Sequence, residues 1–238
     1  MNSHSLSSLP LHVKEGIPAR LPMSYRHIDR SKPKLLTIFL HGYADHGGSF
    51  TRRLFPEGLP KDFEEIAALI PNGPFPVPIK VEDGWREAYA WYFYDDARQK
   101  MVVSPDAAVV GIQTLINELG YGDIPKVLIG FSQGGYLAPY LAQHLSKVVS
   151  IIGIGTGFRA DYFSPLISRS SNAPSVHAVH GTKDEVFPIE QTADAHRKIT
   201  ELGFSGSIHP ISGGTHVASA AMGASLRTLL LQELARLP

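Results

Sequence analysis

The sequence lacks cysteine, an excess of charge of either sign and any long apolar run, and each absence excludes a class of function. None of the 238 residues is cysteine, which excludes disulfides, thiolate catalysis and cysteine-ligated metals but leaves the redox compartment open. Lys and Arg together number 22, as do Asp and Glu, so no basic field exists for nucleic acid or a membrane surface. No run approaches the roughly 18 apolar residues of a membrane span. We therefore expect a soluble, cytoplasmic protein without nucleic-acid or integral membrane association.

The length and the order of apolar segments predict one α/β domain. Residues 1–22 contain Pro10, Gly16 and Pro18 without a sustained period, so they are interpreted as an extended lead-in that has no signal-peptide character. Residues 23–238 are expected to form a single domain, because strands and helices alternate after residue 35. This alternation predicts a mainly parallel central sheet with helices on both faces. Expected strands are 23–28, 35–40, 67–70, 127–129, 148–154, 175–180 and 207–211; expected helices are two short pieces within 50–68, then 105–119, 136–145, 189–202 and 217–237.

One strand leads directly into a serine between two glycines. The apolar run 127–129 is followed by Gly130, Ser132 and Gly134, and a segment with helical spacing begins at Tyr136. This is the G-x-S-x-G nucleophile elbow, in which small neighbours let strand and helix pass closely while a sharp turn exposes the serine hydroxyl. The pattern predicts that Ser132 is a nucleophile.

A nucleophilic serine needs a base, and the base needs a carboxylate to orient it. On a sheet of this kind both should follow the serine on loops just after strands, in the order acid, then histidine. Asp184 follows the strand 175–180, and His216 follows the last strand, so we predict these two as acid and base. Glu185 and Asp161 remain alternatives for the acid. His177, His180 and His209 lie within predicted strands and are interpreted as structural. His196 falls on a polar helix face and His144 near a helix end, so neither lies on a loop after the last strand.

The same chemistry requires two backbone donors for the oxyanion. We predict the amides of Gln133, next to the serine, and of Tyr43, in the loop after strand 35–40, with Gly42 as the alternative to Tyr43. That loop also contains His41, Asp45 and His46. No fourth ligand is spaced to join these three, so no metal site is predicted.

Aromatic residues accumulate between residues 75 and 103, where hydrophobic periodicity is lost. They can cover the sheet edge or line an apolar acyl pocket, and the sequence does not choose between the two. As substrate-contacting residues we predict Trp85 and Trp91 from this segment, together with Phe187.

Four motifs resemble the phospholipase/carboxylesterase family of α/β-hydrolases, which includes the acyl-protein thioesterases. The motifs are 40–45 (LHGYAD), 130–135 (GFSQGG), 180–188 (HGTKDEVFP) and 213–216 (GGTH). The resemblance implies an α/β-hydrolase fold and cofactor-free hydrolysis of ester or thioester bonds, with Ser132, Asp184 and His216 matching the family triad.

The sequence thus predicts a serine carboxylesterase acting on a small-molecule ester or thioester through an acyl-enzyme intermediate. A thioesterase or lysophospholipase acting on longer acyl chains, an amide hydrolase with the same triad, and a catalytically silent binding protein remain alternatives. A homodimer is left open.

Overall fold

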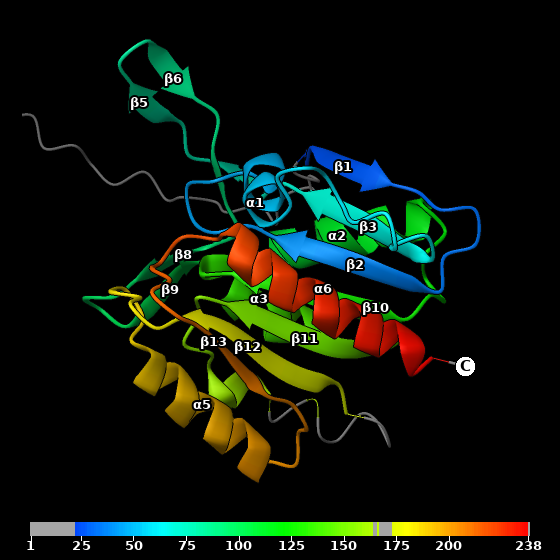
Figure 1. Ribbon diagram of the computed structural model, residues 1–238. Helices are drawn as coiled ribbons and strands as arrows, with labels where there is room; N and C mark the ends of the chain where they lie inside the picture. Colours follow the sequence, from blue (N-terminus) through cyan, green and yellow to red (C-terminus); the bar gives the residue numbers. More distant parts are fainter. Residues whose placement is uncertain (1–21, 164–165, 167–172, 238) are drawn as a thin grey trace, which may run out of the picture.

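A seven-stranded sheet organises the chain in the computed structural model, which describes residues 22–163, 166 and 173–237 (Figure 1). The strand order is β1-β3-β2-β10-β11-β12-β13. Only β1 is antiparallel to its neighbour, whereas the other adjacent strands run parallel. The strands are β1 Tyr25–Ile28, β2 Leu35–Leu40, β3 Ile66–Pro71, β10 Lys126–Phe131, β11 Val148–Ile154, β12 Ser175–Gly181 and β13 Ile208–Ile211.

The central strands are buried because helices cover both faces of the sheet. Strands β2, β3, β10 and β12 are buried at every position, as expected for continuous apolar runs in a parallel sheet. One core cluster joins the sheet to α2 Asp106–Glu118, α3 Gln133–Ala142 and α5 Ile189–Glu201. A second cluster joins the opposite face to α1 Gly47–Leu54 and α6 Ala220–Ala235. The predicted fold class, an α/β sheet with helices on both faces, is confirmed.

Three small antiparallel pairs lie between β3 and α2, and β5–β6 projects away from the main sheet (Figure 1). Strand β4 pairs with β7, β5 with β6, and β8 with β9. Their bounds are β4 Phe75–Pro76, β5 Ile79–Val81, β6 Gly84–Arg86, β7 Tyr89–Ala90, β8 Phe93–Asp95 and β9 Lys100–Val103.

Three boundary predictions were wrong. The helix expected at 136–145 spans Gln133–Ala142 instead, because it begins directly after Ser132. The second helical piece expected within 50–68 does not form, because Pro56, Gly58 and Pro60 interrupt the chain there and turns lead into β3. The last helix begins at Ala220 rather than at residue 217. The Ser219 side chain caps this helix by accepting a hydrogen bond from the Met222 amide. The predicted lead-in falls almost wholly outside the described residues. Within the described ranges, no helix is both long and apolar enough to cross a membrane.

Candidate active site

Ser132 occupies a strained turn between β10 and α3. Its φ of 49° and ψ of −115° lie in a region that non-glycine residues rarely adopt. The flanking glycines permit the tight packing that this turn requires: a Cβ at Gly130 would overlap the Gly134 carbonyl, and a Cβ at Gly134 would overlap the Leu40 carbonyl. The turn therefore holds the serine hydroxyl at the carboxyl end of the central strand.

Ser132, His216 and Asp184 form one hydrogen-bonded line. Nε2 of His216 lies 3.1 Å from Oγ of Ser132, and Nδ1 of His216 lies 2.9 Å from Oδ2 of Asp184. With the Nδ1 proton donated to Asp184, Nε2 is free to accept the proton of the serine hydroxyl. The three predicted side chains come from loops after β10, β12 and β13, and the structure brings them together.

The carboxylate of Asp184 is buried and held by its own loop. Its Oδ1 accepts hydrogen bonds from the amides of Val186 and Phe187, at 3.0 Å and 2.8 Å. His180 supports the same loop, because its Nε2 lies 2.7 Å from the Phe187 carbonyl oxygen. These contacts fix the oxygen that faces His216. The acid alternatives lie elsewhere: Glu185 is exposed, and Asp161 pairs with Arg159.

The other histidines considered from the sequence have different partners. His177 bonds to Ser207, His209 also bonds to Ser207, and His196 bonds to the Val176 carbonyl. His144 is exposed near the end of α3. Among the histidines that the structure describes, only His216 has a hydrogen bond to Ser132.

The loop after β2 lies directly against the serine. A Cβ placed on Gly42 would be 3.5 Å from Cβ of Ser132, so no side chain separates the two backbones. Within the described part of the chain, neither the amide of Tyr43 nor that of Gln133 has a hydrogen-bond acceptor. Two unpaired amides beside a serine form a geometry suited to a negatively charged oxygen. Ala44, at φ 55°, donates from its amide to the Tyr89 carbonyl at 3.0 Å and ties the loop to β7.

His41 anchors this loop, a role that sequence reasoning missed. It is fully buried, its Nε2 accepts the Gly73 N–H at 2.9 Å, and its Nδ1–H donates to the Gly42 carbonyl at 2.7 Å. Burial lowers the pKa of His41 from 6.5 to about 4, outweighing the Gly42 bond and the Asp45 charge, which raise it. The side chain is therefore neutral near pH 7. The H-G pair at the end of a buried strand was the available signal.

The other two members of the His41, Asp45 and His46 group also have partners within the fold. Asp45 pairs with Arg53, and the His46 side chain caps α1 by accepting the Ser49 amide at 3.2 Å. Among the described residues, no three His, Asp or Glu side chains are grouped to hold a metal ion.

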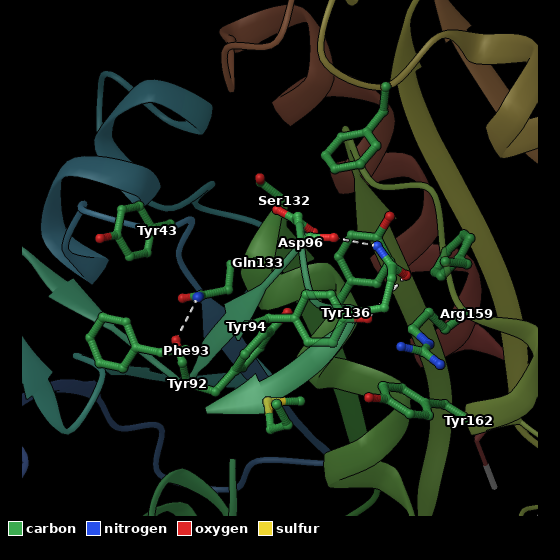
Figure 2. A pocket seen from close by; sticks show the side chains of 14 residues that line it. Tyr43, Tyr92, Phe93, Tyr94, Asp96, Ser132, Gln133, Tyr136, Arg159 and Tyr162 are labelled. Carbon is green, nitrogen blue, oxygen red and sulfur yellow. Dashed lines mark hydrogen bonds between the residues drawn. The ribbon is translucent and has the colours of Figure 1, made fainter. Parts of the chain in front are cut away.

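A cavity of about 620 Å³ opens at Ser132 (Figure 2). This volume lies within the range of small-molecule sites, and the wall is largely aromatic. In Figure 2, Tyr43 and Phe93 lie on one side of the cavity and Arg159 and Tyr162 on the other. The lining residues are Tyr43, Tyr92, Phe93, Tyr94, Asp96, Gln99, Met101, Ser132, Gln133, Tyr136, Phe158, Arg159, Tyr162 and Phe187.

Of the three predicted substrate-contacting residues, only Phe187 lines this cavity. Trp85 is 70% exposed on the projecting β5–β6 hairpin, so its position does not support the prediction. Trp91 is fully buried and donates its indole N–H to the His41 carbonyl at 2.7 Å, which makes it a support for the loop after β2. The neighbouring Tyr92, Phe93 and Tyr94 supply the wall instead, held by the Gln133 side chain.

Comparison with known proteins shows the family of this chain. A family model described as Phospholipase/Carboxylesterase matches residues 27–230. No curated protein matches the chain significantly. Acyl-protein thioesterase 2 of Zea mays is a similar solved structure, with a TM-score of 0.66, 19% identity, and coverage of 89% of this chain and 99% of that one.

Two further solved structures have the same fold. Esterase PE8 has a TM-score of 0.67 at 21% identity, covering 88% of this chain and 98% of that one. SOBER1 of Arabidopsis thaliana has a TM-score of 0.59 at 19% identity, covering 84% of this chain and 99% of that one. At these identities the likeness shows the fold alone, whereas the family model spans most of the sequence. The chain belongs to the phospholipase/carboxylesterase family of α/β-hydrolases.

Proposed function

We propose that the protein is a serine hydrolase that cleaves carboxylic ester bonds through an acyl-enzyme intermediate. The observation that carries the proposal is the hydrogen-bonded line from Ser132 through His216 to Asp184, with distances of 3.1 Å and 2.9 Å. A serine hydroxyl is a weak nucleophile unless a base accepts its proton, and this geometry supplies the base and its orienting carboxylate.

In the proposed acylation step, Oγ of Ser132 attacks the ester carbonyl while Nε2 of His216 accepts the hydroxyl proton. The amides of Tyr43 and Gln133 stabilise the oxyanion, and Asp184 stabilises the imidazolium. His216 then donates the proton to the leaving oxygen as the carbon–oxygen bond breaks. In deacylation, His216 activates a water molecule that attacks the acyl-enzyme, and Ser132 regains its proton. The mechanism uses no metal or cofactor.

The aromatic cavity beside Ser132 supports a small or medium acyl group as substrate. Its wall contributes apolar ring faces, and the Gln133 side chain holds that wall by accepting the Trp91 amide and donating to the Tyr92 carbonyl, both at 3.0 Å. Apolar burial therefore contributes to acyl binding.

Replacing Ser132 with Ala tests the assignment. We expect kcat/KM for 4-nitrophenyl butyrate to fall by roughly 10⁵-fold or more, because the acyl-enzyme can no longer form. Ser146→Ala is the matched control, since Ser146 is exposed and follows the C-terminal end of α3, whereas Ser132 precedes its N-terminal end. Both variants should keep the wild-type circular dichroism spectrum. Wild-type turnover in folded Ser132→Ala would refute the proposal, and so would a wild-type protein that neither hydrolyses esters nor reacts with an organophosphonate.

Thioester cleavage is the second candidate, supported by the shared fold with the maize acyl-protein thioesterase. The same nucleophile and base serve both reactions, so the residues alone do not separate them. Rates for butyryl and longer esters, compared with thioesters of the same acyl groups, would decide which bond and which chain length the enzyme prefers.

A further inference from the structure

A second, smaller cavity lies against His216. Its volume is about 270 Å³, and its wall includes Phe131 and His216. Ser132 lines only the larger cavity and His216 only the smaller one. The two cavities therefore adjoin different members of the Ser132–His216 pair.

The assignment of these cavities rests on the proposed function. If Ser132 is the nucleophile and His216 the base, the two cavities hold different halves of the substrate. The acyl carbon bonds to Ser132, so the acyl group extends into the larger cavity. The leaving atom must receive its proton from Nε2 of His216, which requires the leaving group to lie beside that imidazole. The smaller cavity is the space that adjoins His216, and it is therefore assigned to the leaving group.

The charge of the smaller cavity is positive. The charged residues in its lining are Asp45, Arg53 and Arg86. Arg53 pairs with Asp45 and also donates to Oγ of Ser49 at 2.6 Å, so these two charges offset each other. Arg86 takes part in no ion pair among the residues that the structure describes, and it leaves one uncompensated guanidinium facing the site.

The larger cavity has the opposite balance. Its arginine, Arg159, binds both carboxylate oxygens of Asp161, at 3.1 Å and 2.9 Å. Asp96 also lines that cavity and has no ion-pair partner within the described ranges. An anion would be repelled on the acyl side and attracted on the leaving-group side.

The fold fixes the position of Arg86. It is the last residue of β6 and pairs in register with Ile79, at the base of the projecting hairpin. Three residues later, the Tyr89 amide donates to the Asp45 carbonyl at 2.8 Å. The base of the hairpin is therefore held against the loop that precedes α1, which keeps Arg86 at the cavity rim.

We propose that the enzyme prefers esters whose leaving group carries an anion, a carboxylate or a phosphate, and that Arg86 determines this preference. A guanidinium binds either group through paired N–H donors. Because Arg86 is exposed, the contact is partly screened by solvent. We expect a preference of about fivefold rather than an absolute requirement.

The test compares matched esters with the same butyryl group. The carboxylate arm pairs 3-carboxy-4-nitrophenyl butyrate with 4-nitrophenyl butyrate, and the phosphate arm pairs 1-butyrylglycerol 3-phosphate with 1-butyrylglycerol. In each arm the measured quantity is the kcat/KM ratio of the anionic to the neutral ester. Comparing this ratio between variants cancels the intrinsic reactivity of each ester.

We expect Arg86→Ala to lower the ratio about fivefold, and Arg86→Glu to lower it further, in at least one arm. The arm that responds identifies the anion. Lys80→Ala is the control, because Lys80 lies on the same hairpin but outside the cavity, and it should leave the ratio at the wild-type value. In the wild type the ratio should fall as NaCl is raised from about 0.02 M to about 0.5 M.

Equal ratios in wild type, Arg86→Ala and Arg86→Glu in both arms would overturn the inference. Failure of the underlying function is distinguishable, because Ser132→Ala would then hydrolyse the neutral esters as fast as the wild type. If neutral-ester hydrolysis depends on Ser132 while the ratios do not depend on Arg86, the serine mechanism stands and the leaving-group assignment falls.

Discussion

Acid should destabilise this protein through His41, a residue that the proposed reaction never protonates. His41 is fully buried, accepts the Gly73 amide proton at Nε2 and packs against Trp91 with ring centroids 4.6 Å apart. Protonation at Nε2 would break the bond from Gly73 and place a charge in an apolar site. The folded protein therefore favours the neutral imidazole.

The magnitude follows from the pKa of His41, which burial lowers from 6.5 to about 4. Since the pKa is lower in the folded state, the unfolded chain binds the proton first, and stability is lost as the pH falls from 6.5 towards 4. One pKa unit corresponds to about 1.4 kcal/mol, so we expect this residue alone to remove about 2.5 kcal/mol of unfolding free energy between about pH 7 and about pH 4.5.

The substitution His41→Gln tests this reasoning because glutamine is uncharged at every pH. At about pH 7 it should cost about 1–3 kcal/mol, since one buried hydrogen bond and the packing on Trp91 are lost. Its unfolding free energy should then depend less on pH than that of the wild type, by about 2.5 kcal/mol over the same interval. Urea unfolding followed by circular dichroism at the two pH values measures both effects.

His144→Gln is the control, because His144 is exposed and its side chain makes no hydrogen bond among the described residues. That variant should keep the wild-type pH dependence. If the unfolding free energy of His41→Gln falls by as much as that of the wild type between the two pH values, His41 is not a buried neutral group.

Two other substitutions test the packing around Ser132. Gly134→Ala places a Cβ against the Leu40 carbonyl and should cost about 3 kcal/mol and most of the ester turnover, whereas Gly122→Ala, with no neighbour closer than 3.8 Å, should change urea unfolding by less than about 0.5 kcal/mol. Gln133→Ala keeps the backbone amide but removes the two side-chain bonds to residues 91 and 92, so steady-state kinetics should show a KM raised about fivefold with a smaller change in kcat. A fall in kcat at unchanged KM would contradict that role for the side chain.

The sheet and the elbow could be predicted because local sequence determines them. Strand β11 was predicted over 148–154 and observed as Val148–Ile154, since an unbroken apolar run is compatible with a strand buried on both faces. Chain order then brought the loops of Asp184 and His216 towards Ser132, because parallel strands end at the same edge of the sheet. Their catalytic roles remain predictions until the Ser132 experiment is done.

The cavity wall could not be predicted because contacts distant in sequence determine it. Trp85 and Trp91 are the same residue type in the same aromatic segment. Trp85 is nevertheless exposed on a hairpin, whereas Trp91 is buried under the loop after β2. Short strands such as β5 and β6 carry no usable periodicity, and their pairing depends on the turn between them. Tyr136 and Phe158 were missed for a different reason: they follow strands of the sheet, where apolar residues are expected to be core.

The aperiodic segment between β3 and α2 supports the proposed reaction centre as well as enclosing it. Gly73 holds the ring of His41, Trp91 holds the His41 carbonyl, and Tyr89 exchanges backbone hydrogen bonds with the loop at Ala44 and Asp45. The Tyr43 amide lies between these attachment points. A displacement of this segment would therefore move the proposed oxyanion donor as well as the pocket wall. Because loss of one such donor costs about 10²–10³ in kcat, substitutions that loosen the segment should reduce turnover even where no side chain contacts the substrate.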